Sequence, residues 1–342
     1  MTSTTPPTAL AFVGAGALGQ TFAALIAQSG RAVTLLATPR TAAQLREAGQ
    51  IRLHGAVTAD VPITTAGATP GQVQIITDGA DLPPSSGLIF LTKGHHLPET
   101  IATIRAARSG HDDDVAWVAG FQNGVAKDDL LAAAFGAERV IGGATILSGE
   151  RRADGSVLVT GLGATYLGEL PGGDSPRVTH LIGALTRAGI PAEAPADIRG
   201  VLWSKACNAA GVFGVSVLAR TTAPLVFAEP NLLRAYLALV RETAAIGAAQ
   251  GSAVGDYPNF PPIRTFVTRP EAETLAAVPR GPLPRGGSMP SMMQDLLAGR
   301  PIEVEGVFGD LVERAAQAGV PAPHLTLVRD LLRGLERIAR EG

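Results

Sequence analysis

The stretch Leu10-Ala11-Phe12-Val13-Gly14-Ala15-Gly16-Ala17-Leu18-Gly19 decides the fold of the first half of the chain. It opens with an apolar run typical of a buried strand, and helical spacing of apolar residues continues to Ser29. Gly-x-Gly-x-x-Gly at such a junction is typical of dinucleotide binding: Gly14 permits a tight turn, Gly16 lets the backbone approach a pyrophosphate, and Gly19 lets the helix pack closely. A ligand-free glycine turn is the weaker alternative. We therefore expect Gly14-Ala15-Gly16-Ala17-Leu18-Gly19 to bind a dinucleotide.

The end of the second strand, Val33–Leu36, indicates which dinucleotide. An NAD-specific fold places Asp or Glu there to bind the ribose hydroxyls, but no acid occurs before Glu47. Thr38 and Arg40 follow the strand instead, and their hydroxyl and guanidinium groups could hold a 2′-phosphate. Arg40 taken alone could equally be a solvated surface arginine, so the missing acid carries the argument. We expect NADP, bound as NADPH.

Strand and helix patterns alternate through the first half of the chain, which predicts a parallel sheet with crossover helices. Asp154-Gly155 then separates two short apolar runs, a hairpin signal, so we expect antiparallel strands at the sheet edge. We predict an N-terminal Rossmann domain over residues 1–195. Its expected elements are strands at Leu10–Val13, Val33–Leu36, Leu88–Leu91, Val115–Ala119, Ile146–Arg152, Val157–Thr160 and after Pro191, and helices at Leu18–Ser29, Thr41–Gly49, Leu97–Arg108 and Arg177–Ala188.

Residues 196–342 show helical spacing without strand signals, so the fold class is α/β with an all-helical second domain. Between the helices, Gly255–Gly287 is rich in Pro, Gly and Arg, and we expect irregular surface structure near the site. The expected helices are Asp197–Leu218, Asn231–Gln250, Ser291–Ala298, Pro301–Ala318 and Leu325–Glu341. The apolar stripe of the last helix either packs within the monomer or forms a homodimer contact.

The composition favours a globular protein with a small-molecule partner. The chain has 342 residues, 46% of them hydrophobic and 17% charged, with a net charge of −2 and no long basic run. We therefore expect no nucleic-acid or membrane partner. The N-terminus lacks a signal peptide's basic region, and the most apolar stretch, Ala206–Ala219, is short for a membrane span. The single cysteine, Cys207, suits the reducing cytoplasm. Adjacent His95 and His96 lack further ligands at metal-binding spacing, so we expect no metal site.

Further motifs resemble those of the ketopantoate reductase family, and the resemblance covers nearly the whole chain in the right order. The motifs are Leu91-Thr92-Lys93-Gly94-His95-His96, similar to the family's Lys-x-x-Gln segment with His96 at the glutamine position; Phe121-Gln122-Asn123-Gly124, similar to its Gln-Asn-Gly turn; Trp203-Ser204-Lys205, followed in register by Gly214-Val215-Ser216-Val217-Leu218; and Ser291-Met292-Met293-Gln294-Asp295 with Glu303 at the family interval.

This resemblance implies a Rossmann domain joined to a helical domain, with the active site in the cleft between them. It implies NADPH-dependent reduction of a 2-oxo acid to a 2-hydroxy acid, specifically 2-dehydropantoate to pantoate in pantothenate biosynthesis. Lys205 would be the proton donor and Glu303 its partner. Ser291 would bind the substrate carboxylate, while Asn123 positions the reactants.

The physical chemistry of these residues supports such roles, and each has a simpler alternative. Hydride transfer to a ketone leaves negative charge on oxygen, which a lysine ammonium can neutralise and protonate; Lys205 on an otherwise apolar helix face could instead extend to water. Glu303 could merely complement a helix N-terminus, and Glu305 competes for its role. Ser291 could be only an N-cap, and Asn123-Gly124 only a turn. Lys93 is expected to contact cofactor phosphate or substrate, or else to be an exposed loop lysine.

Several positions depart from the family pattern and leave the substrate open. The family's asparagines after the lysine are replaced by Ala209 and Phe213, although Asn208 could substitute for the first. Pro290 stands where relatives often have a polar side chain, and His96 where they usually have glutamine. These changes favour a more apolar pocket, so a bulkier 2-oxo acid or an imine is an alternative substrate. A catalytically silent NADPH-binding sensor is the alternative from another functional class.

Overall fold

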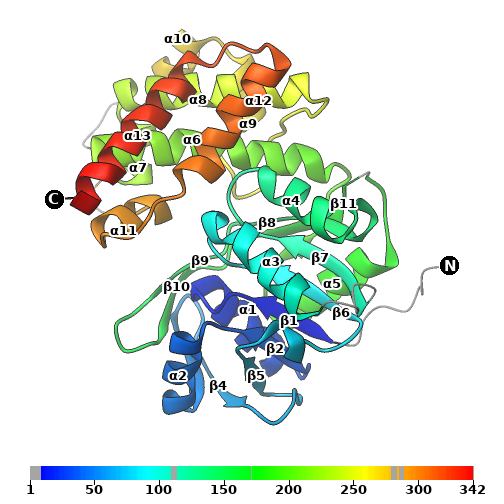
Figure 1. Ribbon diagram of the computed structural model, residues 1–342. Helices are drawn as coiled ribbons and strands as arrows, with labels where there is room; N and C mark the ends of the chain where they lie inside the picture. Colours follow the sequence, from blue (N-terminus) through cyan, green and yellow to red (C-terminus); the bar gives the residue numbers. More distant parts are fainter. Residues whose placement is uncertain (1–8, 109–113, 171, 279–282, 285–288, 342) are drawn as a thin grey trace. The chain divides into compact units, whose positions relative to one another are not determined.

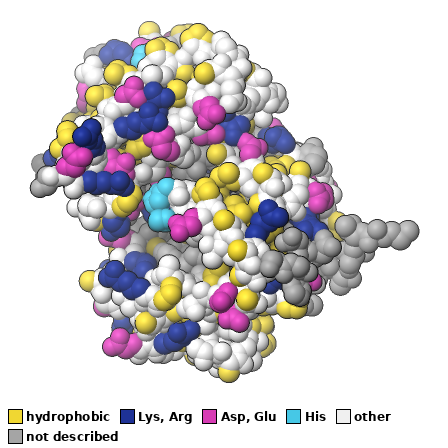
Figure 2. Space-filling model, viewed as in Figure 1, with side chains coloured by type: hydrophobic (Ala, Val, Ile, Leu, Met, Phe, Trp, Pro, Cys, Tyr) yellow, Lys and Arg dark blue, Asp and Glu magenta, His cyan; other side chains and the backbone are white. Residues whose placement is uncertain are grey.

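The computed structural model describes residues 9–108, 114–170, 172–278, 283–284 and 289–341. These divide into two compact units, the first formed by the chain up to Gln122 together with Lys127–Ile198, and the second by Asn123–Ala126 together with the chain from Arg199. The short turn Asn123–Ala126 therefore packs with the second unit although it lies within the sequence of the first. Basic and acidic side chains are interspersed on the face shown in Figure 2, in agreement with the net charge of −2.

A single sheet organises the first unit (Figure 1). Among the described residues, its strands follow the order β12-β11-β8-β7-β6-β1-β2-β5-β4-β3-β10-β9. The consecutive pairs from β8 through β4 are parallel, whereas β9 pairs antiparallel with β10 at one edge. The strands are β1 Leu10–Val13, β2 Val33–Leu36, β3 Gln50–Gly55, β4 Ala59–Thr64, β5 Val73–Ile76, β6 Ser86–Phe90, β7 Val115–Gly120, β8 Val140–Thr145, β9 Ser148–Arg151, β10 Val157–Gly161, β11 Thr165–Glu169 and β12 Ala192–Glu193.

Alternation along β1 shows how the sheet is covered on both faces. Leu10 and Phe12 belong to the core that includes residues of α1 and α5, while Ala11 and Val13 belong to the core that includes residues of α3 and α4. Successive side chains of a strand point to opposite faces, so a fully apolar strand must be covered twice. This layering confirms the expected Rossmann architecture. The helices are α1 Ala17–Gln28, α2 Pro39–Ala48, α3 Leu97–Ala107, α4 Ala126–Phe135 and α5 Pro176–Arg187.

The sequence patterns missed several elements of this unit. β3 and β4 form an antiparallel hairpin whose buried residues alternate with more exposed ones, Ile51 and Leu53 facing the core opposite Val61. The parallel pairing of β3 with β10 joins this hairpin to the β9–β10 hairpin. The strands β5, β8 and β11 and the helix α4 were also not predicted. The patterns of β8, β11 and α4 are weak because Gly, Ala, Asp or Thr interrupt the apolar residues, and β5 is only four residues long.

The described part of the second unit is all-helical, as expected, and is built around α6. This helix is long and apolar enough to cross a membrane by composition, yet 78% of its most apolar window is buried inside the protein. Burial of that kind is typical of the central helix of a helical domain. The helices are α6 Ile198–Ala219, α7 Ala223–Ala228, α8 Pro230–Ala249, α9 Ile263–Thr268, α10 Glu271–Ala276, α11 Ser291–Leu297, η5 Glu305–Gly309, α12 Asp310–Ala318 and α13 Pro323–Glu341.

Two predictions for this unit were wrong in part. The segment Gly255–Gly287 contains the short helices α9 and α10, whose N-cap residues are Pro262 and Pro270. Residues 279–282 and 285–287 lie outside the described residues. The helix expected over Pro301–Ala318 does not begin at Pro301. The chain remains non-helical through Glu303, and the π-helical segment η5 precedes α12.

Candidate active site

The glycine loop after β1 has the geometry that a dinucleotide requires. Gly14 has φ +108°, and its amide donates to the Leu36 carbonyl oxygen at 2.9 Å. A Cβ at Gly14 would lie 2.8 Å from the Thr92 amide nitrogen, and one at Gly19 would overlap the Gly14 carbonyl oxygen. By contrast, the space around a Cβ at Gly16 is open. The loop is therefore closed where the protein packs on itself and open at the middle glycine, where a pyrophosphate approaches.

The loop lies where the direction of the sheet connections changes. β1 pairs with β2 on one side and β6 on the other, and open α/β sheets bind ligands outside the carboxyl ends of strands at such a position. Thr92 Oγ1 and both amide atoms of Gln122, beyond the ends of β6 and β7, are buried without a hydrogen-bond partner among the described residues. Each unsatisfied polar atom costs about 1–3 kcal/mol, so this edge of the sheet suits a polar ligand.

The residues beyond β2 occupy the first turn of α2. Thr38 is the N-cap, and its Oγ1 accepts from the Thr41 amide at 3.3 Å. Arg40 is exposed and forms no ion pair with a carboxylate among the described residues. Lys93 lies half-buried at the N-cap of the 3₁₀ turn η2, Gly94–His96, where His95 and His96 are exposed. No cluster of metal-ligating side chains occurs within the described parts of the chain.

Lys205 lies in the interior of α6 and is half-buried, with Leu202, Ala206 and Ala209 buried around it. The preceding residue, Ser204, is fully buried, and its Oγ accepts from the Gly255 amide at 2.9 Å. This contact fixes the start of the Pro- and Gly-rich segment against the helix that carries the lysine. Buried apolar residues therefore flank Lys205 along its helix, and apolar neighbours strengthen any electrostatic interaction that its ammonium makes.

Asn208 lies one turn after Lys205 and is oriented by a residue that the sequence did not single out. The hydroxyl of Tyr236, on α8, donates to Asn208 Oδ1 at 3.0 Å. Tyr236 is fully buried, and burial raises the pKa of its phenol well above the usual value, so it remains a donor. Because Oδ1 accepts this bond, the side-chain NH₂ of Asn208 is the group left to donate to a ligand.

The Asn123-Gly124 turn packs against the segment that follows Glu303. Gly124 has φ +84°, and a Cβ there would overlap the carbonyl oxygen of Gly306 in η5. Val125, the next residue, belongs to the core of the second unit. The turn is thus more than a connection after β7, because its glycine allows the close backbone contact that holds Asn123 beside η5.

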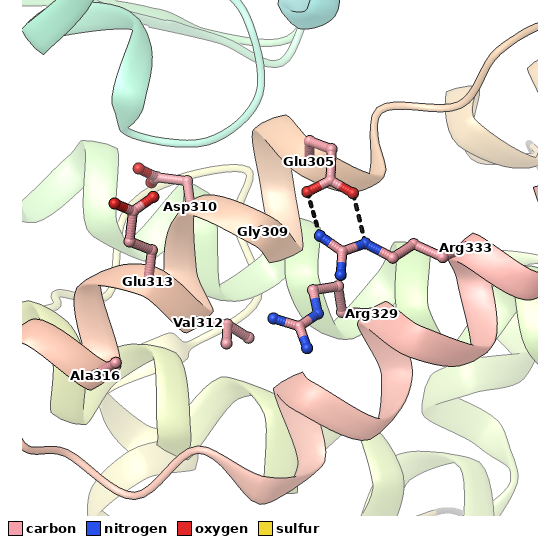
Figure 3. A pocket seen from close by; sticks show the side chains of 8 residues that line it. All are labelled: Glu305, Gly309, Asp310, Val312, Glu313, Ala316, Arg329 and Arg333. Atoms are coloured by element: carbon pink, nitrogen blue, oxygen red, sulfur yellow. Dashed lines mark hydrogen bonds and ion pairs between the residues drawn. The ribbon is translucent and has the colours of Figure 1, made fainter.

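The structure separates the two glutamates that compete for one role. Glu303 is 4% exposed, whereas Glu305 is exposed and its carboxylate accepts from Arg333 Nε at 2.7 Å and Nη2 at 2.6 Å. Hydrogen bonding from Arg333 lowers the pKa of Glu305. Figure 3 shows this pair at a surface pocket of about 420 Å³, lined by Glu305, Gly309, Asp310, Val312, Glu313, Ala316, Arg329 and Arg333. Neither Lys205 nor Glu303 lines this pocket. Glu305 therefore pairs with Arg333 at a surface away from these two residues.

Ser291 is the first residue of α11, and Pro290 rather than Ser291 is its N-cap. No side-chain hydrogen bond caps this helix, so Ser291 does not have the N-cap role considered as an alternative. Asp295, in the same helix, accepts from Arg300 Nε at 2.9 Å. Ser291 is half-buried, and the methionines that follow it are buried in the core.

The candidate residues of the second unit are carried by segments that surround one core. Ala206, Met292, Ile302 and Val304, which flank Lys205, Ser291 and Glu303, all belong to it, as does Val125 beside the Asn123 turn. The structure thus places these candidates on segments that share one hydrophobic core. Of the departures from the family pattern, Ala209 is buried and Phe213 packs partly buried against the same core.

Family models match both halves of the chain. "Ketopantoate reductase PanE/ApbA" matches residues 10–172, and "Ketopantoate reductase PanE/ApbA C terminal" matches residues 197–336. Among curated relatives, the 2-dehydropantoate 2-reductase of Archaeoglobus fulgidus is 26% identical over 95% of this chain and 96% of its own, and that of Pyrococcus abyssi is 24% identical over 95% and 97%.

Solved structures show the same fold over nearly the whole chain. A 2-dehydropantoate 2-reductase from Methylococcus capsulatus has a TM-score of 0.75 and 26% identity, covering 97% of both chains. A D-mandelate dehydrogenase solved with NADH and anilino(oxo)acetate has a TM-score of 0.78 with 19% identity, covering 97% of this chain and 99% of its own. At 19% identity, the similarity to the D-mandelate dehydrogenase concerns the fold alone.

Proposed function

Because the chain belongs to the ketopantoate reductase family, we propose that it reduces the keto group of 2-dehydropantoate to the hydroxyl of pantoate with NADPH. The observation that carries the proposal within the structure is the burial of Glu303 on a segment that shares one core with the helix of Lys205. A buried carboxylate is retained where it has a partner or a task. Glu305, in contrast, is exposed and already has Arg333 as its partner.

The first unit would hold the cofactor. The loop Gly14–Gly19 and the N-terminal end of α1 would bind the pyrophosphate, where backbone amides and the helix dipole favour an anion. Thr38 and Arg40 would bind the 2′-phosphate, and Lys93 a phosphate or the substrate. NADPH, when bound, supplies the hydride. Supporting this assignment, a Cβ at Gly14 would collide with Thr92 and one at Gly19 with the Gly14 carbonyl oxygen, whereas Gly16 leaves space for a ligand.

The second unit would bind the 2-oxo acid and control its proton. As the carbonyl carbon gains a hydride, its oxygen gains the electron pair of the broken π bond, and the Lys205 ammonium would stabilise that charge and transfer a proton from Nζ. Glu303 would accept hydrogen bonds from Lys205 and the product hydroxyl. Ser291 would donate to the substrate carboxylate, while Asn123 and Asn208 would position the substrate.

A bulkier or more apolar 2-oxo acid is the second candidate substrate. Ala209 is buried and Phe213 is partly buried against the core, at positions where the family resemblance implies asparagine. Replacing amide groups by a methyl and a ring removes hydrogen bonds that a hydroxylated substrate would use and favours apolar contact. The chemistry at the keto group would be unchanged.

The test is NADPH oxidation, followed by its absorbance, with purified protein and a panel of 2-oxo acids that includes 2-dehydropantoate. Turnover of 2-dehydropantoate with the highest kcat/KM supports the proposal. Preference for an apolar 2-oxo acid would make that acid the substrate and leave the proposed mechanism of keto reduction unchanged. Tight NADPH binding without turnover of any keto acid would overturn the reductase proposal and favour an NADPH-binding sensor.

The apolar face of α13 supports a further proposal, that the protein forms a homodimer. Leu325 and Leu332 are buried in the core, whereas Leu327, Leu331 and Ile338 are exposed on the same helix. Such a stripe suits a second copy, and light scattering after size-exclusion chromatography tests it. We also propose the cytoplasm as compartment, which suits the single buried thiol of Cys207; cell fractionation checks this.

A further inference from the structure

The β9–β10 hairpin carries an arginine that lies beside the first turn of α2. Arg151, the last residue of β9, donates from Nη2 to Gln44 Oε1 at 2.9 Å and from Nη1 to Thr41 Oγ1 at 3.5 Å. Figure 1 shows this hairpin next to α2, and both belong to the first unit. The contacts join residues 110 and 107 positions apart in the sequence, so no local pattern could reveal them.

This arrangement brings positive charges together, and no carboxylate of the described residues forms an ion pair with them. Thr41, which Arg151 contacts, follows Arg40 directly, and its Oγ1 is also 3.2 Å from that of Thr38. Burial and the charge of Arg40 lower the pKa of Arg151. Arg151 Nε is buried without a hydrogen-bond partner among the described residues, and neither arginine forms an ion pair within them.

Adjacent guanidiniums repel each other, and a bound anion removes that repulsion. The carboxyl end of β2 is where the adenosine ribose lies in this fold, and a phosphate monoester there would offer a charge near −2 and several acceptor oxygens. Arginine suits this acceptor because its planar group donates in a fixed fork. Thr38 and Arg40 supply donors from one side, and Arg151 approaches from the hairpin.

We propose that Arg151 is a second guanidinium ligand for the 2′-phosphate of NADPH and, with Arg40, sets the preference for NADPH over NADH. The proposal rests on the cofactor assignment in the proposed function. It is independent of the substrate, because it concerns only nucleotide binding. It gives the β9–β10 hairpin a role in cofactor choice.

The test is nucleotide affinity, measured by protein fluorescence in the absence of any keto acid. We expect the wild type to bind NADPH more tightly than NADH. In Arg151→Gln the Kd for NADPH should rise about tenfold or more, as the loss of a hydrogen bond between charged groups implies, while the Kd for NADH stays unchanged. Arg151→Lys should keep part of the discrimination, and it replaces Arg151→Gln if the latter fails to fold.

Arg52→Gln is the matched control, because Arg52 also holds this hairpin. Its Nη2 donates to the Asp154 carbonyl at 3.0 Å and it pairs with the Asp154 carboxylate. We expect its NADPH and NADH affinities to match the wild type. Equal loss of both nucleotides in the Arg151 variants, or no loss of NADPH, overturns the role of Arg151. A wild type that binds neither nucleotide overturns the cofactor assignment as well, whereas absent turnover with intact discrimination refutes only the reductase.

Discussion

The backbone of Gly124 lies against the carbonyl oxygen of Gly306 so closely that no side chain fits between them. The contact joins the turn that carries Asn123 to the π-helical segment that follows Glu303. Asn123 and Glu303, which are proposed to act in the reaction, therefore lie on the two segments that this backbone contact joins, and substitution of its glycine should disturb both.

We expect Gly124→Ala to destabilise the protein by about 1–3 kcal/mol, since φ +84° is unfavourable for alanine and its Cβ has no space. The catalytic rate should fall as well, because Asn123 and Glu303 shift. Urea unfolding and steady-state kinetics measure the two effects. Gly30→Ala is the control, with φ +89° and open space around the added Cβ. Equal effects of both substitutions would show that contact with Gly306 is unimportant.

Lys205→Ala should lower kcat by about 10²–10⁴-fold, the usual contribution of a positioned general acid. NADPH affinity should not change, because the proposed cofactor contacts lie in the first unit. Rapid-mixing kinetics and fluorescence titration separate the two quantities. Unimpaired turnover in this variant would require another proton donor.

The two glutamates should behave in opposite ways. Glu303→Gln should reduce kcat strongly with little change in NADPH affinity, whereas Glu305→Gln should leave turnover near the wild-type value. Its burial distinguishes Glu303, and the ion pair with Arg333 occupies Glu305. A Glu305→Gln variant as inactive as Glu303→Gln would reverse the assignment.

The Glu305–Arg333 pair also predicts a small acid dependence of stability. Arg333 lowers the pKa of Glu305, so the stabilisation is present above the ordinary glutamate pKa and is lost as the pH falls through the lowered one. Because the pair is exposed, we expect about 0.2–1 kcal/mol. Thermal melting of Glu305→Gln and wild type should therefore differ at neutral pH and converge in acid.

Tyr236→Phe tests the orientation of Asn208. Removing the hydroxyl leaves Asn208 Oδ1 without this donor, so the amide can rotate. We expect KM for the keto acid to rise several-fold, within the roughly tenfold that a neutral hydrogen bond contributes. The affinities for NADPH and NADH should not change. An unaltered KM would show that Asn208 does not contact the substrate.

How far the sequence could predict this protein is clearest from particular segments. β1 and α1 were predictable because apolar period and glycine spacing agree, and the place of Lys205 on a helix because its motif sits within an unbroken helical pattern. Glu303 and Glu305 could not be distinguished, because helical phase cannot be read through a segment that is first non-helical and then π-helical. Arg151 was missed because its partners lie on a helix that is far away in the sequence. β3 and β4 were missed although their residues alternate, because each strand is only six residues long and shows the alternation only two or three times.

The π-helical segment holds one residue more between Glu303 and α12 than an α-helix would. A π turn absorbs this extra residue locally, so the chain on either side keeps the phase of a continuous helix. Deletion of one residue from Glu305–Gly309 should therefore convert η5 to α-helix and leave Glu303 in phase with α12. The same deletion within Asp310–Ala318 would instead rotate the residues before it by about 100° around the helix axis. A deletion in α12 should therefore be more damaging to the position of Glu303 than one in η5.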